Sequence, residues 1–241
     1  MSRELRWDGA CNLRDLGGLR RHDGTITATG RLFRSGRTES VSQAGWRSAR
    51  AAGVKTVVDL RNDDEIGRGV NDPPLGETPS SLATLHRPIE DQSNAEFMDQ
   101  YGQLLAHPAY YPGNFEFFPD LLADAIGTIA TAPTGLLFHC SAGKDRTGLI
   151  AAILLMINGV VLDEVLADYE AGIRGYSEWQ HQHPGQGRER TLSDAELNDA
   201  VAERVQFLGT WLSETDIPTV LVEELSLEEE VVESASRLLE S

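Results

Sequence analysis

The stretch that decides the fold is Leu136-Leu137-Phe138-His139-Cys140-Ser141-Ala142-Gly143-Lys144-Asp145-Arg146-Thr147-Gly148. The apolar run Gly135–Phe138 predicts a buried strand, and Thr147–Asn158, apolar almost all round, predicts a central helix. A loop of six residues follows Cys140 and joins the two. This arrangement places a thiol and a turn of unpaired backbone N–H groups at the positive end of a helix, where a phosphate dianion binds well.

The side chains of this loop suit phosphoryl transfer through a covalent intermediate. The positive end of the helix favours the thiolate of Cys140, which makes this residue the candidate nucleophile. The planar guanidinium of Arg146 can bind two phosphate oxygens at once. Gly143 allows the loop to close tightly, and the hydroxyl of Thr147 can stabilise the departing thiolate. The catalytic candidates are therefore Cys140, Asp145, Arg146 and Thr147, and the phosphate-binding candidates are Ser141, Ala142, Gly143, Lys144, Asp145 and Arg146.

A simpler interpretation of Cys140 is a buried structural cysteine before a helix, which is a common place for this residue. That interpretation explains the cysteine alone. It does not explain why Gly, Lys, Asp, Arg and Thr follow it in one strand–loop–helix junction. The loop therefore indicates a catalytic site.

Outside the loop, strands alternate with helices, a pattern typical of an α/β fold. We expect one domain over residues 1–241, with a central mostly parallel sheet, helices on both faces and a helical C-terminal half. Within this domain, residues at about 94–131 could instead form a helical lid or insertion. The expected strands are Arg31–Phe33, Lys55–Leu60 and Gly135–Phe138. The expected helices are Ser42–Ala52, Asn94–His107, Phe115–Thr131, Thr147–Asn158 and two that open with the capping boxes Ser193-x-x-Glu196 and Ser226-x-x-Glu229, and residues 67–92 are expected to form a long surface connection.

The charge of the 241-residue chain is unevenly spread. Residues 1–61 hold 12 Lys and Arg against 6 Asp and Glu, a net charge of +6, whereas residues 62–241 hold 9 against 32, a net charge of −23. The basic first part can supply cations to an anion site. The acidic remainder disfavours nucleic acid as a partner and makes anionic membrane lipids a poor one.

The N-terminal residues and the two cysteines indicate where the protein is located and whether it binds a metal. Residues 1–15 are charged and lack the apolar segment of a secretory signal, so we expect a cytoplasmic protein, with export by a leaderless route left open. Cys11 and Cys140 lie too far apart in sequence to suggest a metal motif or a disulfide framework. We therefore expect a reducing compartment and no metal.

Cys140-x5-Arg146 followed by Thr147 resembles the signature of the protein tyrosine phosphatase superfamily. The longer stretch His139–Gly148 resembles the bacterial and fungal tyrosine/serine branch of that superfamily. Further segments agree with this branch: Asn12–Gly18, Arg31–Ser35, and Asp59-Leu60-Arg61 with Glu65 close behind. The resemblance covers about residues 8–175.

This resemblance implies a three-layer α/β fold and a phosphatase that needs no cofactor. The implied substrate is a phosphorylated protein or peptide, with phosphotyrosine first and phosphoserine or phosphothreonine also accepted, and the implied product is inorganic phosphate. Lys144 is also typical of phosphoinositide phosphatases, but these enzymes carry a second lysine where this chain has Ser141. A phosphoinositide phosphatase and a phosphate-binding pseudoenzyme stay open as alternatives; the pseudoenzyme would have lost the cysteine or the arginine, and this chain keeps both.

The general acid departs from the classical pattern. Classical tyrosine phosphatases carry this acid roughly thirty residues before the cysteine, but residues 103–116 contain no aspartate and Glu116 falls in an expected helix. The branch resemblance nominates Asp145, with Asp59 second. The alternative for Asp145 is a structural acceptor that holds the loop or pairs with Arg14 or Arg61.

Four residues are expected to support the loop. Asp59 and Arg61 can form an ion pair, Arg14 is expected to shape the pocket wall, and His139 is expected to hold the loop by hydrogen bonds rather than to carry a proton. The aromatic group Tyr110, Tyr111, Phe115, Phe117 and Phe118 is expected in the core, with a lid over the pocket as the alternative.

Overall fold

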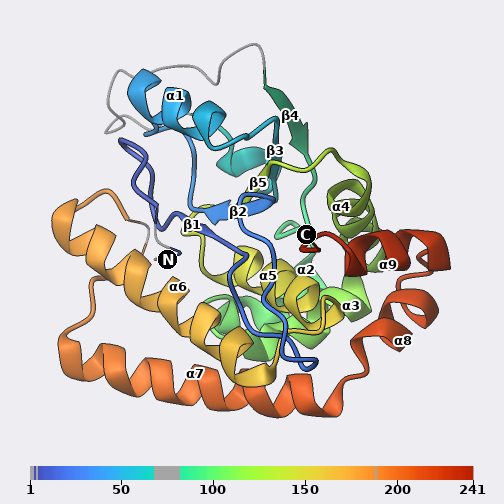
Figure 1. Cartoon of the computed structure of the whole chain (residues 1–241). Coiled ribbons are helices and arrows are strands. Elements are labelled where there is room, and N and C mark those ends of the chain that lie inside the picture. Colours follow the sequence, from blue (N-terminus) through green and yellow to red (C-terminus); the bar gives the residue numbers. More distant parts are fainter. Residues whose placement is uncertain (1–2, 4, 68–81, 188, 241) are drawn as a thin grey trace.

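A computed structural model describes residues 3, 5–67, 82–187 and 189–240 of the chain (Figure 1). Within this part, five strands form one sheet in the order β1-β2-β5-β3-β4, in which only the β1–β2 pair is antiparallel. The strands are β1 (Arg14–Asp15), β2 (Leu32–Ser35), β3 (Thr56–Asp59), β4 (Ala83–His86) and β5 (Leu136–His139). The predicted α/β class with a mostly parallel central sheet is confirmed.

Alternate residues of each central strand point to opposite faces of the sheet, as the pleat requires. On one face, Val57 of β3 and Leu137 of β5 pack with Trp46 of α1 (Gln43–Ala51) in one apolar cluster. On the other face, Val58 and Phe138 belong to the main core together with helices α4 (Pro119–Thr131) and α5 (Asp145–Ile157). Figure 1 shows α1 on one side of the sheet and the later helices on the other, which gives the three expected layers.

The central helix of the main core is α5 (Asp145–Ile157), in which every residue from Arg146 to Leu155 is buried. It begins two residues before the predicted start. The helices before it are α2 (Ala95–Tyr101), α3 (Tyr111–Phe117) and α4 (Pro119–Thr131), with short 3-10 turns η1 (Asp63–Glu65), η2 (Gly102–Leu104) and η3 (Pro108–Tyr110). Those after it are α6 (Leu162–Gln182), α7 (Asp194–Glu214), α8 (Ile217–Glu223) and α9 (Glu229–Ser236).

Two predicted helix starts have the expected caps. The side chain of Ser42 accepts a hydrogen bond from the N–H of Gly45 at the start of α1. Ser193 and Glu196 form the reciprocal capping box at the start of α7. The second predicted box, at Ser226, is wrong: Ser226 has a φ of +54°, and α9 begins at Glu229 with Glu228 as its cap.

Other boundaries differ from the sequence-based expectation for physical reasons. The expected surface connection at 67–92 contains strand β4, whose first two residues are exposed, so no apolar alternation marks it; residues 68–81 of that connection lie outside the described part. The helix expected at Asn94–His107 ends as α-helix at Tyr101 and continues as 3-10 turns. The helix expected at Phe115–Thr131 is broken at Phe118, and Pro119 opens α4.

The aromatic group of the segment at 94–131 lies in the core. Tyr110, Tyr111, Phe115 and Phe118 are buried in the same cluster as β5 and α5, and Phe117 is half-buried against it. The core interpretation of these residues is therefore confirmed.

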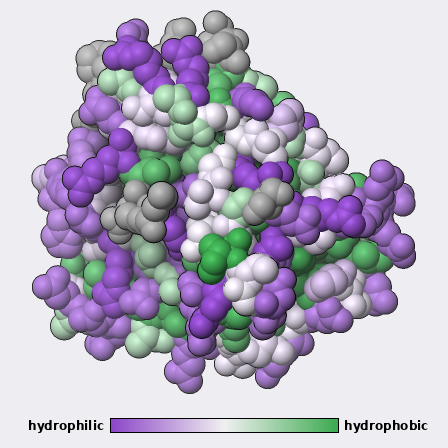
Figure 2. Space-filling view, viewed as in Figure 1, coloured by the Kyte–Doolittle hydropathy of each residue, from purple (hydrophilic) through white to green (hydrophobic). Residues whose placement is uncertain are grey.

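The surface drawn in Figure 2 is mainly hydrophilic, with the apolar residues in small separate patches. Among the helices of the described residues, none combines the length and the apolar character that crossing a bilayer requires.

Candidate active site

The site is built on the carboxyl ends of three neighbouring parallel strands. Ser35 of β2 and Asp59 of β3 both pair in register with His139 of β5, so the three strands end abreast. Loops from parallel strands that end together meet at the same edge of the sheet. The loop that begins at Cys140 therefore lies between the segment after Ser35 and the segment after Asp59.

The carbonyl groups of this phosphate loop (residues 140–146) face outward. The N–H of Arg37 donates to the Ser141 carbonyl at 2.9 Å, and the Asn12 amide donates to the carbonyls of Ala142 and Gly143 at 3.0 and 3.1 Å. In a planar trans peptide the N–H points opposite to the C=O. The N–H groups of Ala142, Gly143 and Lys144 therefore turn to the inner side of the loop, where they can bind an anion.

Gly143 is required by the shape of the loop. Its φ is +68°, and a Cβ at this position would lie 2.5 Å from the backbone of Ser35 and of Gly36. Both the backbone angle and the close approach exclude a side chain. The segment after β2 thus serves as a wall against which the phosphate loop closes.

Cys140 and Thr147 flank the phosphate loop, and Thr147 lies in the first turn of α5. Both are buried, with 2% and 0% of their surface exposed, and the Thr147 hydroxyl has no hydrogen-bond partner among the described residues. This hydroxyl is thus available for a group in the loop. The unpaired N–H groups of the first turn of α5 add positive potential at the same place.

Arg146 is fixed from behind by Glu65. Its Nη1 and Nη2 atoms donate to the two oxygens of Glu65, with 2.8 Å between Nη2 and Oε1. Burial alone would lower the pKa of Arg146, but the hydrogen bonds to Glu65 hold it well above its ordinary value, so the guanidinium stays charged. The edge of the guanidinium that carries Nε remains for a ligand, and Glu90 lies 3.5 Å from Nε.

Asp59 and Arg61 form the expected ion pair. Arg61 donates from Nε and Nη2 to the two oxygens of Asp59 at 2.9 and 2.7 Å, and from Nη1 to the Glu65 carbonyl at 3.1 Å. Burial would raise the pKa of Asp59, but the hydrogen bonds and charge of Arg61 hold it below its ordinary value. Asp59 is thus an ionised support for the turn that carries Glu65.

The Asp145 carboxyl group has fewer hydrogen bonds than that of Asp59. Its Oδ1 atom is buried without a hydrogen-bond partner among the described residues, and its Oδ2 atom lies 3.5 Å from Nζ of Lys144. Burial raises the pKa of Asp145 against the lowering effect of Lys144. A pair of Asp145 with Arg14 or Arg61 is not seen, since Arg14 bonds Asp168 and Arg61 bonds Asp59.

The ammonium group of Lys144 points away from the inner side of the loop. Its Nζ atom donates to Glu189 at 2.7 Å and lies 5.7 Å from the centre of the Tyr176 ring. Lys144 therefore contributes its backbone N–H to the loop, while its side chain joins the loop to the segment after α6.

His139 holds the loop, as expected. Its Nδ1 atom lies 3.1 Å from the Cys140 carbonyl oxygen, and its Nε2 atom lies 3.9 Å from Oδ2 of Asp59. Burial lowers the pKa of His139, which favours the neutral ring despite the opposing charge of Asp59.

Behind the loop lies a cluster that the sequence did not reveal. Arg3, Arg14 and Arg34 all donate to the buried carboxylate of Asp168 on α6. Arg34 also donates to the Gly143 carbonyl at 3.0 Å, and Arg14 donates to the Asn12 amide oxygen at 2.9 Å. The cluster thus fixes the phosphate loop directly and through Asn12. No local pattern marks Asp168, which lies 134 positions from Arg34.

Asp168→Asn is expected to lower the free energy of unfolding by about 3–5 kcal/mol, because the buried arginines would lose their counter-ion. Urea denaturation at neutral pH measures this. The exposed partner of Arg237, Glu233, provides a control, since Glu233→Gln removes only a surface pair and is expected to change little. Equal effects of the two substitutions would contradict the structural role of Asp168.

The effect of Asp168 depends on pH with a defined sign. Burial would raise the pKa of Asp168, but the charges of Arg14, Arg34 and Arg3 hold it far below its ordinary value. The contribution of Asp168 to stability is therefore complete above the unfolded-state pKa of about 3.9 and is lost as the pH falls toward the folded-state value. The difference in the free energy of unfolding between wild type and Asp168→Asn should therefore become smaller as the pH falls below about 3.9.

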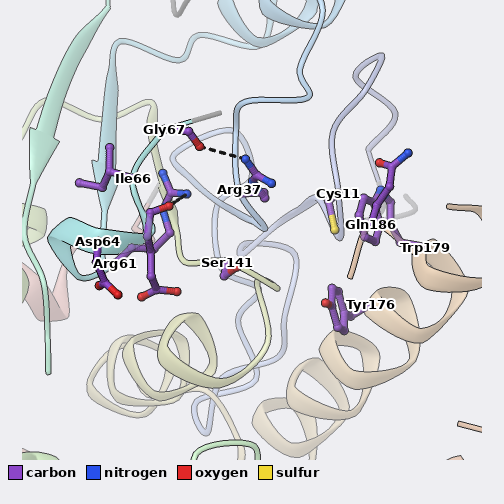
Figure 3. Close-up of a pocket in the computed structure, with 11 residues that line it drawn as sticks. Cys11, Arg37, Arg61, Asp64, Ile66, Gly67, Ser141, Tyr176, Trp179 and Gln186 are labelled. Atoms are coloured by element: carbon purple, nitrogen blue, oxygen red, sulfur yellow. Dashed lines mark hydrogen bonds between the residues drawn. The ribbon is translucent and has the colours of Figure 1, made fainter. Parts of the chain in front are cut away.

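A cavity of about 300 Å³ opens beside the loop (Figure 3). Arg61, Asp64 and Ile66 line one side of the cavity, and aromatic residues of α6 line the opposite side. Ser141 lies between the two sides. These aromatics, Tyr176 and Trp179, are stacked with ring centres 5.9 Å apart. The cavity has the walls and size to receive an aromatic group next to the loop.

Comparisons with known proteins find similar sequences among tyrosine phosphatases. The family model described as "Tyrosine phosphatase family" matches residues 5–237. A Cupriavidus necator protein, provisionally named a tyrosine-protein phosphatase, is 33% identical over 181 residues, 69% of this chain and 62% of the relative. The triple specificity protein phosphatase PtpB of Mycobacterium tuberculosis is 29% identical, over 67% of this chain and 66% of the relative. A tyrosine-protein phosphatase of Nostoc commune is 31% identical, over 64% of this chain and 52% of the relative. In each case the match spans less than two thirds of the relative.

Proposed function

The chain belongs to the tyrosine phosphatase family, and from that premise we propose that it hydrolyses phosphate monoesters through a phosphocysteine intermediate on Cys140. The observation that carries this proposal is the outward bonding of the loop carbonyls, which turns a set of N–H groups inward around the start of α5. Hydrogen bonds from Asn12 and Arg37 hold the loop, and Glu65 holds Arg146. Pre-organised donors of this kind stabilise the charge of a transferring phosphoryl group.

In the first step, the thiolate of Cys140 attacks phosphorus in line with the leaving oxygen. The sulfur–phosphorus bond forms as the phosphorus–oxygen bond breaks, while the inner N–H groups and Arg146 bind the equatorial oxygens. Asp145 donates its proton to the leaving oxygen, and its raised pKa and its unpartnered Oδ1 atom support this role.

In the second step, water attacks the phosphocysteine. Asp145, now a carboxylate, accepts the proton of the water, and the sulfur leaves as a thiolate. The Thr147 hydroxyl, unpartnered among the described residues, is the proposed donor to that thiolate. Inorganic phosphate is the product. The supporting residues Asp59, Arg61, Arg14 and His139 hold the loop and take no part in proton transfer.

We propose protein phosphotyrosine as the main substrate, with phosphoserine and phosphothreonine as poorer ones. The cavity beside Ser141, with Tyr176 and Trp179 along one wall, supports an aromatic leaving group. We further propose that the chain acts as one phosphatase domain. A reducing compartment such as the cytoplasm suits the mechanism, which needs the free thiol that Cys140 has in this structure.

Phosphate release tests this proposal. The protein should release phosphate from a phosphotyrosine peptide faster than from the matched phosphoserine peptide or from phosphoinositides in vesicles. Faster release from the vesicles would make the protein a lipid phosphatase. Binding of the peptides without any release would make it a phosphate-binding pseudoenzyme.

A further inference from the structure

Glu90 is a buried carboxyl group beside Arg146 that the mechanism above does not use. It lies in the loop between β4 and α2, where its neighbour Ile89 is fully buried in the core. Only 2% of Glu90 is exposed. Its Oε1 atom accepts a hydrogen bond from Gln92 at 2.7 Å and lies 3.5 Å from Nε of Arg146. Its Oε2 atom has no hydrogen-bond partner among the described residues.

The surroundings of Glu90 favour its neutral form. Arg146 faces it from α5, but Glu65 on η1 already pairs with that guanidinium. The other ionisable groups around it are acidic: Asp145 on α5, Tyr110 on η3, and Asp63, Asp64 and Asp91, which line a cavity of about 760 Å³ together with Glu90. Burial raises the pKa of Glu90, and the negative charges of Glu65 and Asp145 raise it further. The charge of Arg146 and the hydrogen bond from Gln92 lower it, but the net shift of the Glu90 pKa is upward.

The position of Glu90 decides what its charge would do. Because Nη1 and Nη2 of Arg146 each donate to Glu65, the edge with Nε is left for a phosphate oxygen, and Glu90 faces this edge. An ionised Glu90 would compete for the Nε–H and repel a dianion. A neutral Glu90 does neither, and its O–H can donate a hydrogen bond.

We propose that Glu90 is a positioning residue of the phosphate pocket that must be protonated for Arg146 to bind a tetrahedral dianion. The inference rests on the proposed function of the loop. Binding of the dianion is then linked to binding of a proton by Glu90. Affinity for the dianion then falls as the pH rises through the pKa of Glu90, with a limiting slope of about tenfold per pH unit.

The test measures sulfate binding by calorimetry as a function of pH. Sulfate stays a dianion throughout the range in which carboxyl groups titrate, and the Cys140→Ser background removes the titration of the thiol. Cys140→Ser is expected to lose affinity as the pH rises. Cys140→Ser/Glu90→Gln, whose amide resembles the neutral acid but cannot ionise, is expected to keep its affinity and to exceed Cys140→Ser by at least about tenfold at the alkaline end.

Two further variants separate Glu90 from its neighbours. Cys140→Ser/Asp145→Asn removes the other acid beside Arg146 and should keep the pH dependence. Cys140→Ser/Gln92→Leu keeps Glu90 but removes a donor that favours its ionised form, so the loss of affinity should move to higher pH. This variant also tests the proposal if Glu90→Gln fails to fold.

Each remaining outcome overturns the inference. An unchanged pH dependence in Glu90→Gln, or a pH-independent loss of affinity, would leave Glu90 with a structural role only. Loss of the pH dependence in Asp145→Asn alone would place the linked proton on Asp145. In these cases the phosphate site itself stands, whereas absence of sulfate binding in Cys140→Ser at every pH would overturn the phosphate site as well.

Discussion

Cys140→Ser is expected to lower turnover of a phosphotyrosine peptide by more than about four powers of ten while leaving its binding largely intact. The reason is that, in the proposed mechanism, one set of groups binds the phosphate and another group attacks it. The N–H groups turned inward and Arg146 bind the phosphate, whereas the thiolate alone forms the covalent bond. Turnover and peptide affinity are measured separately, by phosphate release and by equilibrium binding.

The matched control for this prediction is Cys11→Ser. Cys11 is also buried, at 1% exposure, and unpaired, so the same atom is exchanged in a similar environment. It should retain most of the wild-type turnover. A Cys140→Ser protein that keeps a substantial fraction of wild-type turnover would contradict the covalent mechanism.

Asp145→Asn is expected to slow hydrolysis of a phosphotyrosine peptide by roughly two to four powers of ten, because a tyrosine phenolate needs a proton to depart. The loss should be much smaller for a substrate with a nitro-activated leaving group, which departs nearly unaided. The reaction needs the protonated acid, so wild-type activity should fall as the pH rises through the pKa of Asp145, which burial raises. This alkaline limb should be absent from the Asp145→Asn profile.

Asp59→Asn distinguishes an acid from a support. Because Arg61 holds Asp59 ionised, its replacement should disturb the turn that carries Glu65 and harm all substrates alike. If Asp59→Asn showed the leaving-group dependence and Asp145→Asn did not, the acid would be Asp59.

Where the sequence predicts the structure well, the signal is local. Ser42 and Ser193 mark helix starts through hydrogen bonds to N–H groups only three residues away. The strand, loop and helix around Cys140 are equally local, since the apolar runs and Gly143 specify them within one stretch. The sequence also suffices to place Cys140 and Arg146 in one loop.

Helix α6 (Leu162–Gln182) is a failed prediction whose cause lies far away in the sequence. Helix α6 contains Gly172 and Gly175, which weaken its helical signal, and it was not predicted. A Cβ on Gly172 would lie 2.8 Å from the guanidinium of Arg14, and one on Gly175 would lie 2.6 Å from the Asn12 amide. These glycines let α6 approach the phosphate loop, a requirement that only the folded chain shows.

The site residues that the sequence missed have the same origin. Asp168 becomes important because three distant arginines converge on it, and Glu90 because a core contact of Ile89 brings it next to Arg146. For Lys144, the sequence places the residue in the loop but does not reveal that its ammonium donates to Glu189.

The most direct test of the account is to trap the covalent intermediate. A substrate with a nitro-activated leaving group, which can form the phosphocysteine without the acid, is mixed with Asp145→Asn, in which hydrolysis of the phosphocysteine lacks its base. The reaction is quenched within one turnover, and the digested protein is analysed by peptide mass spectrometry. The account predicts a mass increase of one phosphoryl group on the peptide that contains Cys140, and none on the peptide that contains Cys11. Release of phosphate by the wild type without an adduct at Cys140 in either protein, at any quench time, would contradict it.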